Sequence, residues 1–370
     1  MEFTVSRTDL VRELNLSQGV VEKKTTIPIL SNVLVEADGD RIHLTATDLE
    51  LGIRCSCAAR VKKAGAGTIP ARRLLDYARL LPEADIQVKI QENHWASLVC
   101  GRSRTRIAGM SRESFPELPQ MPAVLAEIPI GVIASMIAKT IFSISTEESR
   151  FTLNGALLVL RKGGLTMVAT DGHRLAMVES TGEMAGITEA YRALLPRKAM
   201  SELQKLAGDS DPAAIVKFSG DDNHLFFQLG DRLLLSRKLT GNFPDYLRVL
   251  PKEQPSEIVL EREEFRGAIE RVAQFSDERT RSIRVRVGPG EIKIHSSVSE
   301  TGESEESLPA TFEGAAVEIG FNAQYLLDFL RAVDGPQISF LFKDPQSAGE
   351  LRPGGEKPEI YRYVIMPMRI

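Results

Sequence analysis

The feature that most constrains this chain is an internal repeat with a period of 126 residues. Three twelve-residue segments with apolar side chains at helical spacing begin at Pro70, Pro196 and Asn322, so each follows the previous one by 126 positions. Each segment also carries an acidic residue followed three positions later by a basic one, which puts both on one face of a helix. A solenoid repeat is only about 20–50 residues long. The 370 residues are therefore predicted to form three similar domains.

Other landmarks recur near the same period and indicate domain boundaries. The tripeptide Ala46–Asp48 ends an alternating apolar strand and returns as Ala169–Asp171 at the end of a second such strand. Phe115-Pro116 similarly returns as Phe243-Pro244. Prolines cluster shortly after each of these Phe-Pro pairs, and proline clusters are typical of breaks between elements. From these breaks we expect an N-terminal domain at 1–122, a central domain at 123–251 and a C-terminal domain at 252–370.

Each repeat combines strands with helices. Segments such as 42–45 and 292–295 alternate apolar and polar side chains instead of forming continuous apolar runs. This alternation favours antiparallel sheets with one solvated face. A helical stripe follows the first strand of each repeat and is clearest from Phe265 to Val272. The sequence therefore predicts an α+β fold, in which each of three tandem similar domains has two helices packed on antiparallel sheets.

The charge of the whole chain conceals an uneven distribution. With 46 basic and 50 acidic side chains, the net charge of −4 argues against a uniformly basic nucleic-acid-binding protein. Segments 70–81 and 196–207 nevertheless each carry three basic residues and one acidic residue, whereas 322–333 is balanced. Two basic helices at equivalent places suit a phosphate backbone, which lysine and arginine neutralise without reading sequence. The alternative for any one of these helices is an ordinary solvated face.

Other features define the class of protein by exclusion. No run approaches the roughly 18 apolar residues of a membrane helix, and the first residues lack the apolar core of a signal peptide, so we expect a soluble cytoplasmic protein. The three cysteines, Cys55, Cys57 and Cys100, are odd in number and lack zinc-site spacing. We therefore interpret them as strand residues and expect neither a metal nor another cofactor.

The best candidate for catalysis is the string Thr170–Leu175, in which Asp171 and His173 lie close together. A hydrolase or transferase uses such a pair for acid–base chemistry, although no nucleophile or phosphate-loop motif accompanies it here. The alternative is a tight turn between strands in which Gly172 supplies a positive φ. Both hypotheses remain open on these residues alone.

Several motifs, taken together and in order, resemble the bacterial DNA polymerase III beta subunit family, the sliding clamps. The most specific are Thr170–Ala176, which reads TDGHRLA, and Tyr363–Ile370, which reads YVIMPMRI. The other matching segments, each weak alone, are Thr26–Asn32, Thr47–Glu50, Gly101–Arg104, Leu153–Gly155, Phe243–Tyr246 and Gly320–Asn322. The resemblance therefore extends along the whole chain.

This resemblance implies the DNA clamp fold and a head-to-tail homodimer, whose six domains form a ring with helices inside and sheets outside. It implies a non-catalytic processivity subunit that encircles double-stranded DNA without sequence specificity and tethers the replicative polymerase. Because a ring holds DNA by topology, its basic lining need not bind tightly, and this permits sliding. The implied partners are the polymerase alpha subunit, the clamp loader delta subunit and other proteins with a clamp-binding motif, with no membrane. A scaffold that never closes into a ring is a further alternative.

The same resemblance assigns residues to three surfaces. The expected DNA-binding residues are Lys24, Arg72, Arg73, Arg150, Phe151, Arg197 and Lys198. The expected peptide cleft, an apolar groove with a polar rim, comprises Leu153, Thr170, Gly172, His173, Arg174, Leu175, Pro244, Arg248, Val249, Asn322, Tyr325, Val364, Ile365, Met366, Pro367, Met368, Arg369 and Ile370. The expected dimer contacts are Ile107 and Phe275.

Four positions depart from the pattern of the family. Thr105 and Gln274 stand at the dimer contact where larger apolar residues are familiar, which predicts a more polar interface. Thr152 replaces an aromatic residue next to the expected DNA contacts, and Thr280 replaces a bulkier residue near the cleft.

Overall fold

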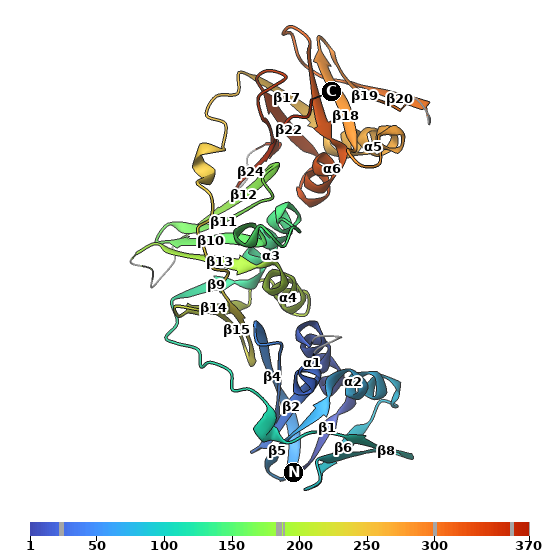
Figure 1. The fold of residues 1–370 in the computed structure, drawn as a ribbon, viewed down its shortest axis with the longest axis vertical. Coiled ribbons are helices and arrows are strands. Elements are labelled where there is room, and N and C mark those ends of the chain that lie inside the picture. The colour runs from blue at the N-terminus through green and yellow to red at the C-terminus, as the bar shows by residue number, and fades with distance from the viewer. Residues whose placement is uncertain (22–25, 183–186, 188, 299–301, 356–358, 370) are drawn as a thin grey trace. The chain divides into compact units, whose positions relative to one another are not determined.

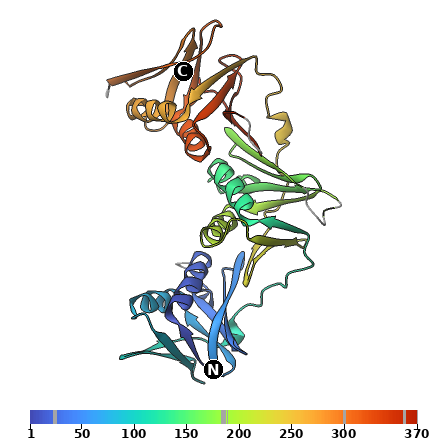
Figure 2. The same ribbon diagram turned by 180° about the vertical axis from the view of Figure 1, so that it is seen from behind.

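Strands pair in the antiparallel sense in every ladder that the structure describes, as their alternating pattern predicts. The structure is a computed structural model, and Figures 1 and 2 show it from opposite sides. It describes residues 1–21, 26–182, 187, 189–298, 302–355 and 359–369. The chain divides into two compact units: unit 1 is Met1–Ala134 with Lys198–Lys238, and unit 2 is Ser135–Arg197 with Leu239–Ile370.

A twelve-stranded sheet forms the frame of unit 1. Its strands are β1 (Glu2–Ser6), β2 (Asn32–Asp38), β3 (Arg41–Thr47), β4 (Leu51–Lys63), β5 (Gly65–Pro70), β6 (Asp85–Ile90), β7 (Trp95–Cys100), β8 (Ser103–Ala108), β9 (Ala126–Pro129), β14 (Ile215–Gly220), β15 (His224–Leu229) and β16 (Arg232–Arg237). The main path runs β8-β7-β6-β1-β4-β16-β15-β14-β9, while β3 also pairs with β4, and β2 and β5 follow β3. The long strand β4 pairs with β16 near its start and with β1 near its end. Strands from the central repeat thus extend the sheet that the first repeat begins.

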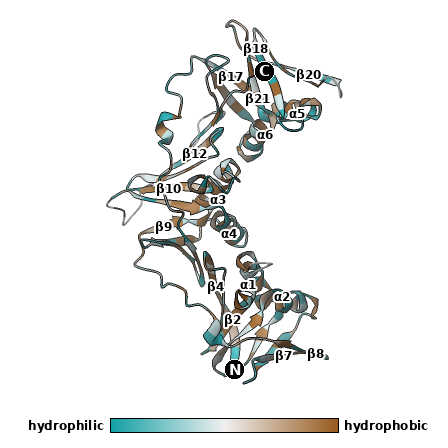
Figure 3. Cartoon of the chain, in the orientation of Figure 1, coloured by the Kyte–Doolittle hydropathy of each residue, from teal (hydrophilic) through white to brown (hydrophobic). Residues whose placement is uncertain are grey.

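Helices α1 (Arg7–Val20) and α2 (Ala71–Leu80) pack together in unit 1, as Figure 1 shows. In α2 the side chains of Leu74, Leu75 and Ala78 are buried, while Arg72 and Arg73 are exposed. This amphipathic division is the one that the spacing over 70–81 predicts, and Figure 3 colours the residues of α2 by their hydropathy. Each fully buried leucine stabilises the fold by about 1.5–3 kcal/mol, so the buried stripe fixes which face of α2 remains in solvent.

Unit 2 contains an eight-stranded sheet and a four-stranded sheet. The first has the order β13-β10-β11-β12-β24-β23-β22-β17 and the second β20-β19-β18-β21. Their bounds are β10 (Gly155–Arg161), β11 (Gly164–Thr170), β12 (Arg174–Thr181), β13 (Tyr191–Pro196), β17 (Ser256–Glu261), β18 (Ser282–Gly288), β19 (Glu291–Val298), β20 (Gly302–Pro309), β21 (Val317–Asn322), β22 (Gln337–Phe342), β23 (Gly349–Pro353) and β24 (Glu359–Ile365). The pairing of β12 with β24 joins the central repeat to the last strand of the chain.

The other helices are α3 (Ile130–Thr140), α4 (Arg197–Gly208), α5 (Arg262–Val272) and α6 (Ala323–Ala332). Helices α4, α5 and α6 confirm the three further helices that the apolar spacing predicts. Their acidic–basic pairs differ, however. Glu202 and Lys205 form an ion pair of 2.7 Å in α4, whereas Asp328 of α6 pairs with Arg174 at 2.6 Å. In α2, Asp76 lies 3.6 Å from Arg72. Residue spacing predicts that an acidic and a basic side chain lie on the same face of a helix, but it does not predict that another residue pairs with one of them instead.

The interpretation of the three cysteines as strand residues is confirmed. Cys55 and Cys57 lie on β4 and Cys100 on β7, and all three are free and buried. Burial raises the pKa of Cys57 to about 12, so this thiol stays protonated. Among the described helices, none has the length and apolar character needed to cross a membrane.

Candidate functional site

The string Thr170–Arg174 folds as a tight turn between β11 and β12. The Asp171 carboxylate accepts hydrogen bonds from the backbone N–H groups of His173 and Arg174 at 2.9 and 3.1 Å. The Thr170 hydroxyl donates to the Arg174 carbonyl at 2.6 Å and accepts from the Gly172 N–H at 3.1 Å. Gly172 has a φ of 91°, a conformation that favours glycine. The tight turn offered by the sequence as one of two alternatives is confirmed.

The Arg174 side chain fastens this turn to the C-terminal part of unit 2. Its guanidinium donates to Asp171 at 2.9 Å and to Asp328 of α6 at 2.6 Å, and it also donates to the Phe142 carbonyl. It stacks over the Tyr325 ring at 4.2 Å. Only 10% of the side chain is exposed, and these anionic and aromatic partners compensate for its burial. Arg174 therefore has a structural role, because its side chain connects the turn to α6 and to the Phe142 carbonyl.

Asp171 and His173 do not form an acid–base pair in the described part of the chain. The Asp171 carboxylate bonds to two backbone N–H groups and one guanidinium, and in the described part of the chain it makes no hydrogen bond to the His173 ring. The imidazole is exposed, and the His173 carbonyl accepts from the Met366 N–H at 2.9 Å. This geometry gives no support to a hydrolase or transferase at this string.

The floor beside the turn is an apolar cluster in unit 2. Its buried members are Leu157, Val159, Val168, Leu175, Met177, Leu194, Tyr246, Leu250 and Val364, with Leu239, Phe243 and Ala348 packed against them. Leu175 lies opposite Val364 in the β12–β24 ladder, and both are 1% exposed. Sequence reasoning included these two residues but missed most of the floor. Strands β10 and β11 are nearly continuous apolar runs that are buried on both faces, so alternation in the sequence could not show which of their residues form this floor.

The C-terminal segment runs from this floor to a hollow of about 670 Å³ lined by Gly320, Gln346, Met368 and other residues. Ile365 is buried, whereas Met366 is 47% exposed, and the Met368 N–H donates to the Gly320 carbonyl at 2.8 Å. Pro367, Met368 and Arg369 line the hollow. Ile370, also expected in the cleft, lies outside the described residues.

Asn322 and Tyr325 border the same region from the start of α6. The Asn322 side chain caps this helix by accepting from the Gln324 N–H at 2.9 Å, and it donates to the Thr280 carbonyl at 3.1 Å. The Tyr325 carbonyl accepts from the Tyr363 hydroxyl at 2.9 Å. Burial raises the pKa of Tyr363, so its phenol remains a donor at neutral pH.

The remaining expected cleft residues lie on connecting segments. Pro244, Arg248 and Val249 belong to the segment that carries the buried Tyr246 and Leu250, and all three are exposed. Leu153 ends the short 3-10 helix Phe151–Leu153 and is half-buried. The structure thus unites the turn, the C-terminal strand and the apolar floor, and leaves the connecting segments as an exposed rim.

The expected DNA-binding residues occupy helix starts and a short loop. Arg72 and Arg73 lie in the first turn of α2, and Arg197 and Lys198 in the first turn of α4, all exposed. The other members of the set are Arg150, which pairs with Glu147 at 2.9 Å and donates to the Asp171 carbonyl at 2.7 Å, and Phe151, which is 69% exposed. Lys24 lies outside the described residues.

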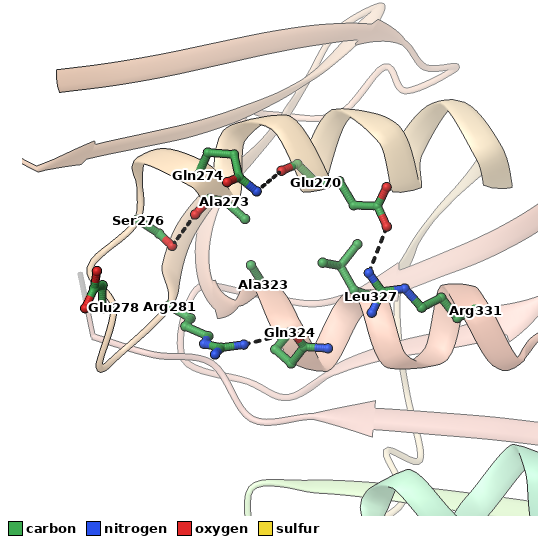
Figure 4. A pocket seen from close by; sticks show the side chains of 10 residues that line it. All are labelled: Glu270, Ala273, Gln274, Ser276, Glu278, Arg281, Ala323, Gln324, Leu327 and Arg331. Atoms are coloured by element: carbon green, nitrogen blue, oxygen red, sulfur yellow. Dashed lines mark hydrogen bonds and ion pairs between the residues drawn. The ribbon is translucent and has the colours of Figure 1, made fainter. Parts of the chain in front are cut away.

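The expected dimer contacts flank two terminal strands. Ile107 is on β8, the last strand of its sheet, but its side chain is 3% exposed and belongs to the core of unit 1. Phe275 follows α5 and is half-buried against β20, the last strand of its sheet. Next to it, a cavity of about 720 Å³ opens between α5 and α6, and Figure 4 shows Gln274, Leu327 and the Glu270–Arg331 ion pair on its walls.

Antiparallel sheets and paired helices recur along the chain, and a buried apolar cluster lies beside the turn. Models of the DNA polymerase III beta subunit match the chain in all three parts: its N-terminal domain at residues 1–119, its central domain at 127–245 and its C-terminal domain at 247–369. The chain therefore belongs to the DNA polymerase III beta subunit family, the DNA sliding clamps, which are non-catalytic processivity factors.

Individual relatives agree with this assignment. The beta sliding clamps of Pseudomonas putida and Caulobacter vibrioides are 34% and 35% identical to it, each over the full length of both chains. Among solved structures, the DNA polymerase III subunit beta of Pseudomonas aeruginosa has a TM-score of 0.93 at 33% identity, with both chains fully covered. The sliding clamp of Bacillus subtilis has a TM-score of 0.94 at 26% identity, with 100% and 99% coverage.

Proposed function

We propose that two copies of this chain close head to tail into a ring around double-stranded DNA. The observation that carries the proposal is a pair of unpaired sheet edges with opposite charge. Strand β8 exposes Arg104 and Arg106, and strand β20 exposes Glu303 and Glu305. Each strand ends its sheet, so each offers free backbone groups to a partner strand. Pairing β8 of one copy with β20 of another satisfies both edges and matches their charges.

The cavity between α5 and α6 supports the same contact. Its lining mixes Leu327 and Ala273 with Gln274, Glu270 and Arg331. A wall of this kind suits a partly polar interface, in keeping with the departures at Thr105 and Gln274. We infer that charge contributes more than apolar burial to closure of this ring, so that closure weakens at high salt.

Basic residues at the starts of α2 and α4 suit contact with a duplex. A positive side chain in the first turn of a helix opposes the helix dipole and costs about 0.3–1 kcal/mol. Arg72, Arg73, Arg197 and Lys198 all take that position, and neither first turn carries an acidic residue, although Asp76 lies 3.6 Å from Arg72 and Asp48 pairs with Lys198. A bound phosphate backbone offsets this cost, because its negative charge lies close to both the basic side chains and the helix N-termini. Arg150 and Phe151 extend the proposed contact, and so does Lys24 by resemblance alone.

The groove of unit 2 is the proposed docking site for partner proteins. Its floor is apolar and buried, and its rim includes Met366, Met368 and the exposed Arg248. A short peptide with one or two apolar anchors fits such a surface, because a few buried side chains supply most of the binding energy. We propose the polymerase alpha subunit, the clamp loader delta subunit and other proteins with a clamp-binding motif as its ligands. The domain limits 1–122, 123–251 and 252–370 remain a prediction.

Retention on circular DNA tests ring closure around a duplex. After loading onto a nicked circle, the chain should co-elute with DNA and be released when the circle is cut. Equal retention on circular and linear DNA would contradict encirclement.

Sedimentation of matched charge variants tests the proposed interface. The double variant R104E and R106E should be monomeric, because it faces Glu303 and Glu305 with like charge. Adding E303R and E305R to the same chain should restore the dimer. A wild-type monomer at micromolar concentration would favour an open scaffold instead.

A further inference from the structure

Unit 1 contains a counterpart of the floor of the cleft. Leu34 on β2, Thr45 on β3, Arg54 on β4 and Leu233 on β16 lie directly opposite one another in successive ladders, so their side chains share one face of the sheet. Residues 112–121, which contain the first Phe-Pro pair, lie over that face together with them around one cavity.

The repeat relates this row to a row in unit 2. Starting from the equivalent threonines Thr47 and Thr170, the sequence spacing pairs Thr45 with Val168 and Arg54 with Met177. Val168 and Met177 lie opposite each other in the β11–β12 ladder and belong to the floor of the proposed peptide cleft. The first repeat thus has a hydroxyl and a guanidinium where the second has two apolar side chains.

The face is hollowed, with a cavity of about 390 Å³. Phe115 closes one wall and is only 4% exposed, packing with Leu34 in a small apolar cluster. Leu118 and Met121 line the cavity from the covering segment. A space of this size and mixed lining falls within the range of pockets that bind small molecules and short peptide segments.

Four polar side chains that line the cavity have no partner in the described part of the chain: Thr45, which is buried, and Arg54, Glu117 and Gln120, which are exposed. The Thr45 hydroxyl is buried, its residue is 2% exposed, and it makes no hydrogen bond. An unpaired buried hydroxyl is costly, and this one lies beside the cavity, where a bound group can accept its hydrogen bond. Arg54 forms no ion pair, whereas the neighbouring Arg112 lies 3.6 Å from Glu36. The free hydroxyl and the free guanidinium are directly cross-strand from each other.

We propose that this cavity binds a short peptide segment in which a carboxylate side chain adjoins an apolar one. The carboxylate pairs with the Arg54 guanidinium and accepts from the Thr45 hydroxyl, while the apolar side chain packs against Leu34 and Phe115. Arginine suits a carboxylate because its planar fork donates two parallel hydrogen bonds. The comparison with unit 2 rests on the peptide role proposed for the cleft, but the site itself stands on the unpaired groups of unit 1.

Binding of two fluorescein-labelled pentapeptides to the full-length chain tests the site. The sequences Ala-Leu-Asp-Leu-Ala and Ala-Leu-Asn-Leu-Ala differ only in the charge, and fluorescence polarisation measures both affinities. Because the groove of unit 2 also fits apolar anchors, the binding that remains in Arg54→Met is subtracted as the contribution of that groove. We expect the aspartate peptide to bind about tenfold more tightly than the asparagine peptide, as a charge-assisted hydrogen bond provides. Arg54→Met and Thr45→Val give this row the residues of unit 2 and should remove the preference. Arg60→Met, on the same strand but outside the cavity, should retain it.

A second measurement separates a binding role from a structural one. Thr45→Val removes an unpaired buried hydroxyl, so it should raise the melting temperature while it weakens aspartate-peptide binding. A lower melting temperature for Thr45→Val would overturn the proposal, as would equal affinity for the two peptides or a preference that persists in Arg54→Met. Retention of the Arg54→Met variant on nicked circles should match that of the wild-type chain, so failure of the ring and failure of this site give different results.

Discussion

Two turns in this chain have the same hydrogen bonds and different structural consequences. In the first, the Thr47 hydroxyl donates to the Leu51 carbonyl at 2.9 Å, and the Asp48 carboxylate accepts from the N–H groups of Glu50 and Leu51 at 2.9 and 2.6 Å. The Leu49 N–H donates to the Thr47 hydroxyl at 3.0 Å. The turn at Thr170–Arg174 repeats each of these bonds at the equivalent positions.

The two turns differ in what their aspartates bind next. Asp48 pairs with Lys198, whose side chain is 43% exposed, whereas Asp171 pairs with Arg174, whose side chain is 10% exposed and which also holds Asp328. In both turns the threonine lies four residues, and the aspartate three residues, before the last residue of the turn. These two side chains make all the shared hydrogen bonds, so they account for the local geometry of the turn. The residue that meets the carboxylate decides whether the turn also holds distant elements together.

Replacing Arg174 with alanine has the largest expected effect on this comparison. It leaves the carboxylates of Asp171 and Asp328 without their buried cation, and removal of one partner from such a group costs about 3–5 kcal/mol. Five of the six tyrosines lie in unit 2, so tyrosine absorbance during urea unfolding reports on that unit. We expect the tyrosine transition to move to lower urea, while the fluorescence of the single tryptophan, Trp95 in unit 1, moves less.

Lys198→Met is the matched control in the first turn. The Asp48 side chain is only 4% exposed, but Lys198 is 43% exposed and Asp48 keeps its two backbone donors when the lysine is lost. The Trp95 transition should therefore shift by less than the about 3–5 kcal/mol expected where the cation is buried as well. Equal losses in Lys198→Met and Arg174→Ala would show that burial of the cation does not separate the two turns.

The local part of this comparison could be predicted from sequence, and the long-range part could not. Apolar spacing predicts α2, α4, α5 and α6, and the string at Thr170 predicts a turn with Gly172 in a left-handed conformation. These features depend on residues within a few positions of one another. Resemblance to a family adds the C-terminal segment as a neighbour of the turn.

Contacts between residues that are far apart in the sequence could not be predicted from local patterns. Nothing near Arg174 in sequence indicates that its guanidinium meets Asp328 or the Phe142 carbonyl, because these contacts depend on how β12 pairs with β24. Ile107 looks like an apolar surface residue on an edge strand, yet it is 3% exposed because its side chain faces the core of unit 1. Strand alternation predicts that a residue faces one side, but the packed layers decide which side is buried.

Unit 1 also contains a buried ion pair, between Glu13 and Arg232, which should weaken at acidic pH. Glu13 of α1 is 1% exposed and accepts from Arg232 of β16 at 2.8 and 2.9 Å. Burial opposes its charge, but hydrogen bonds from Arg232 and Arg12 outweigh this and hold the pKa of Glu13 below its usual value of 4.5. A carboxyl group with a lowered pKa contributes stability above its unfolded pKa and loses it as pH falls through the folded one.

Glu13→Gln should therefore destabilise unit 1 at pH 7, by less than Arg174→Ala destabilises unit 2, because glutamine keeps part of the hydrogen bonding. The gap between Glu13→Gln and the wild-type chain should narrow as pH falls below 4.5, since protonation of Glu13 mimics the substitution. Urea midpoints of Trp95 fluorescence at several pH values measure this gap. A constant gap from pH 7 to acid would mean that the Glu13 charge does not fasten α1 to β16.

Gly172→Ala tests the residue that follows the aspartate in the second turn. Its φ of 91° is unfavourable for alanine, and the new Cβ lies 2.9 Å from the Arg150 guanidinium. We expect a loss of about 1–2 kcal/mol in the tyrosine transition. Gly163→Ala, in the neighbouring hairpin with open space around its Cβ, is the control and should change little. Similar losses in both variants would assign the effect to alanine itself rather than to the conformation of the turn.

Leu49→Gly tests the equivalent position in the first turn and should have the smallest effect, with the opposite sign. Leu49 has a φ of 78°, so this turn holds a left-handed conformation without glycine, and its side chain is 52% exposed. Relief of about 1 kcal/mol of backbone strain is partly offset by the larger conformational freedom of glycine in the unfolded chain. We expect a net gain of about 0.5 kcal/mol in the Trp95 transition. A loss instead would mean that the exposed leucine makes a stabilising contact that outweighs its strain, and the two turns would then differ at this position as well as in the partner of their aspartates.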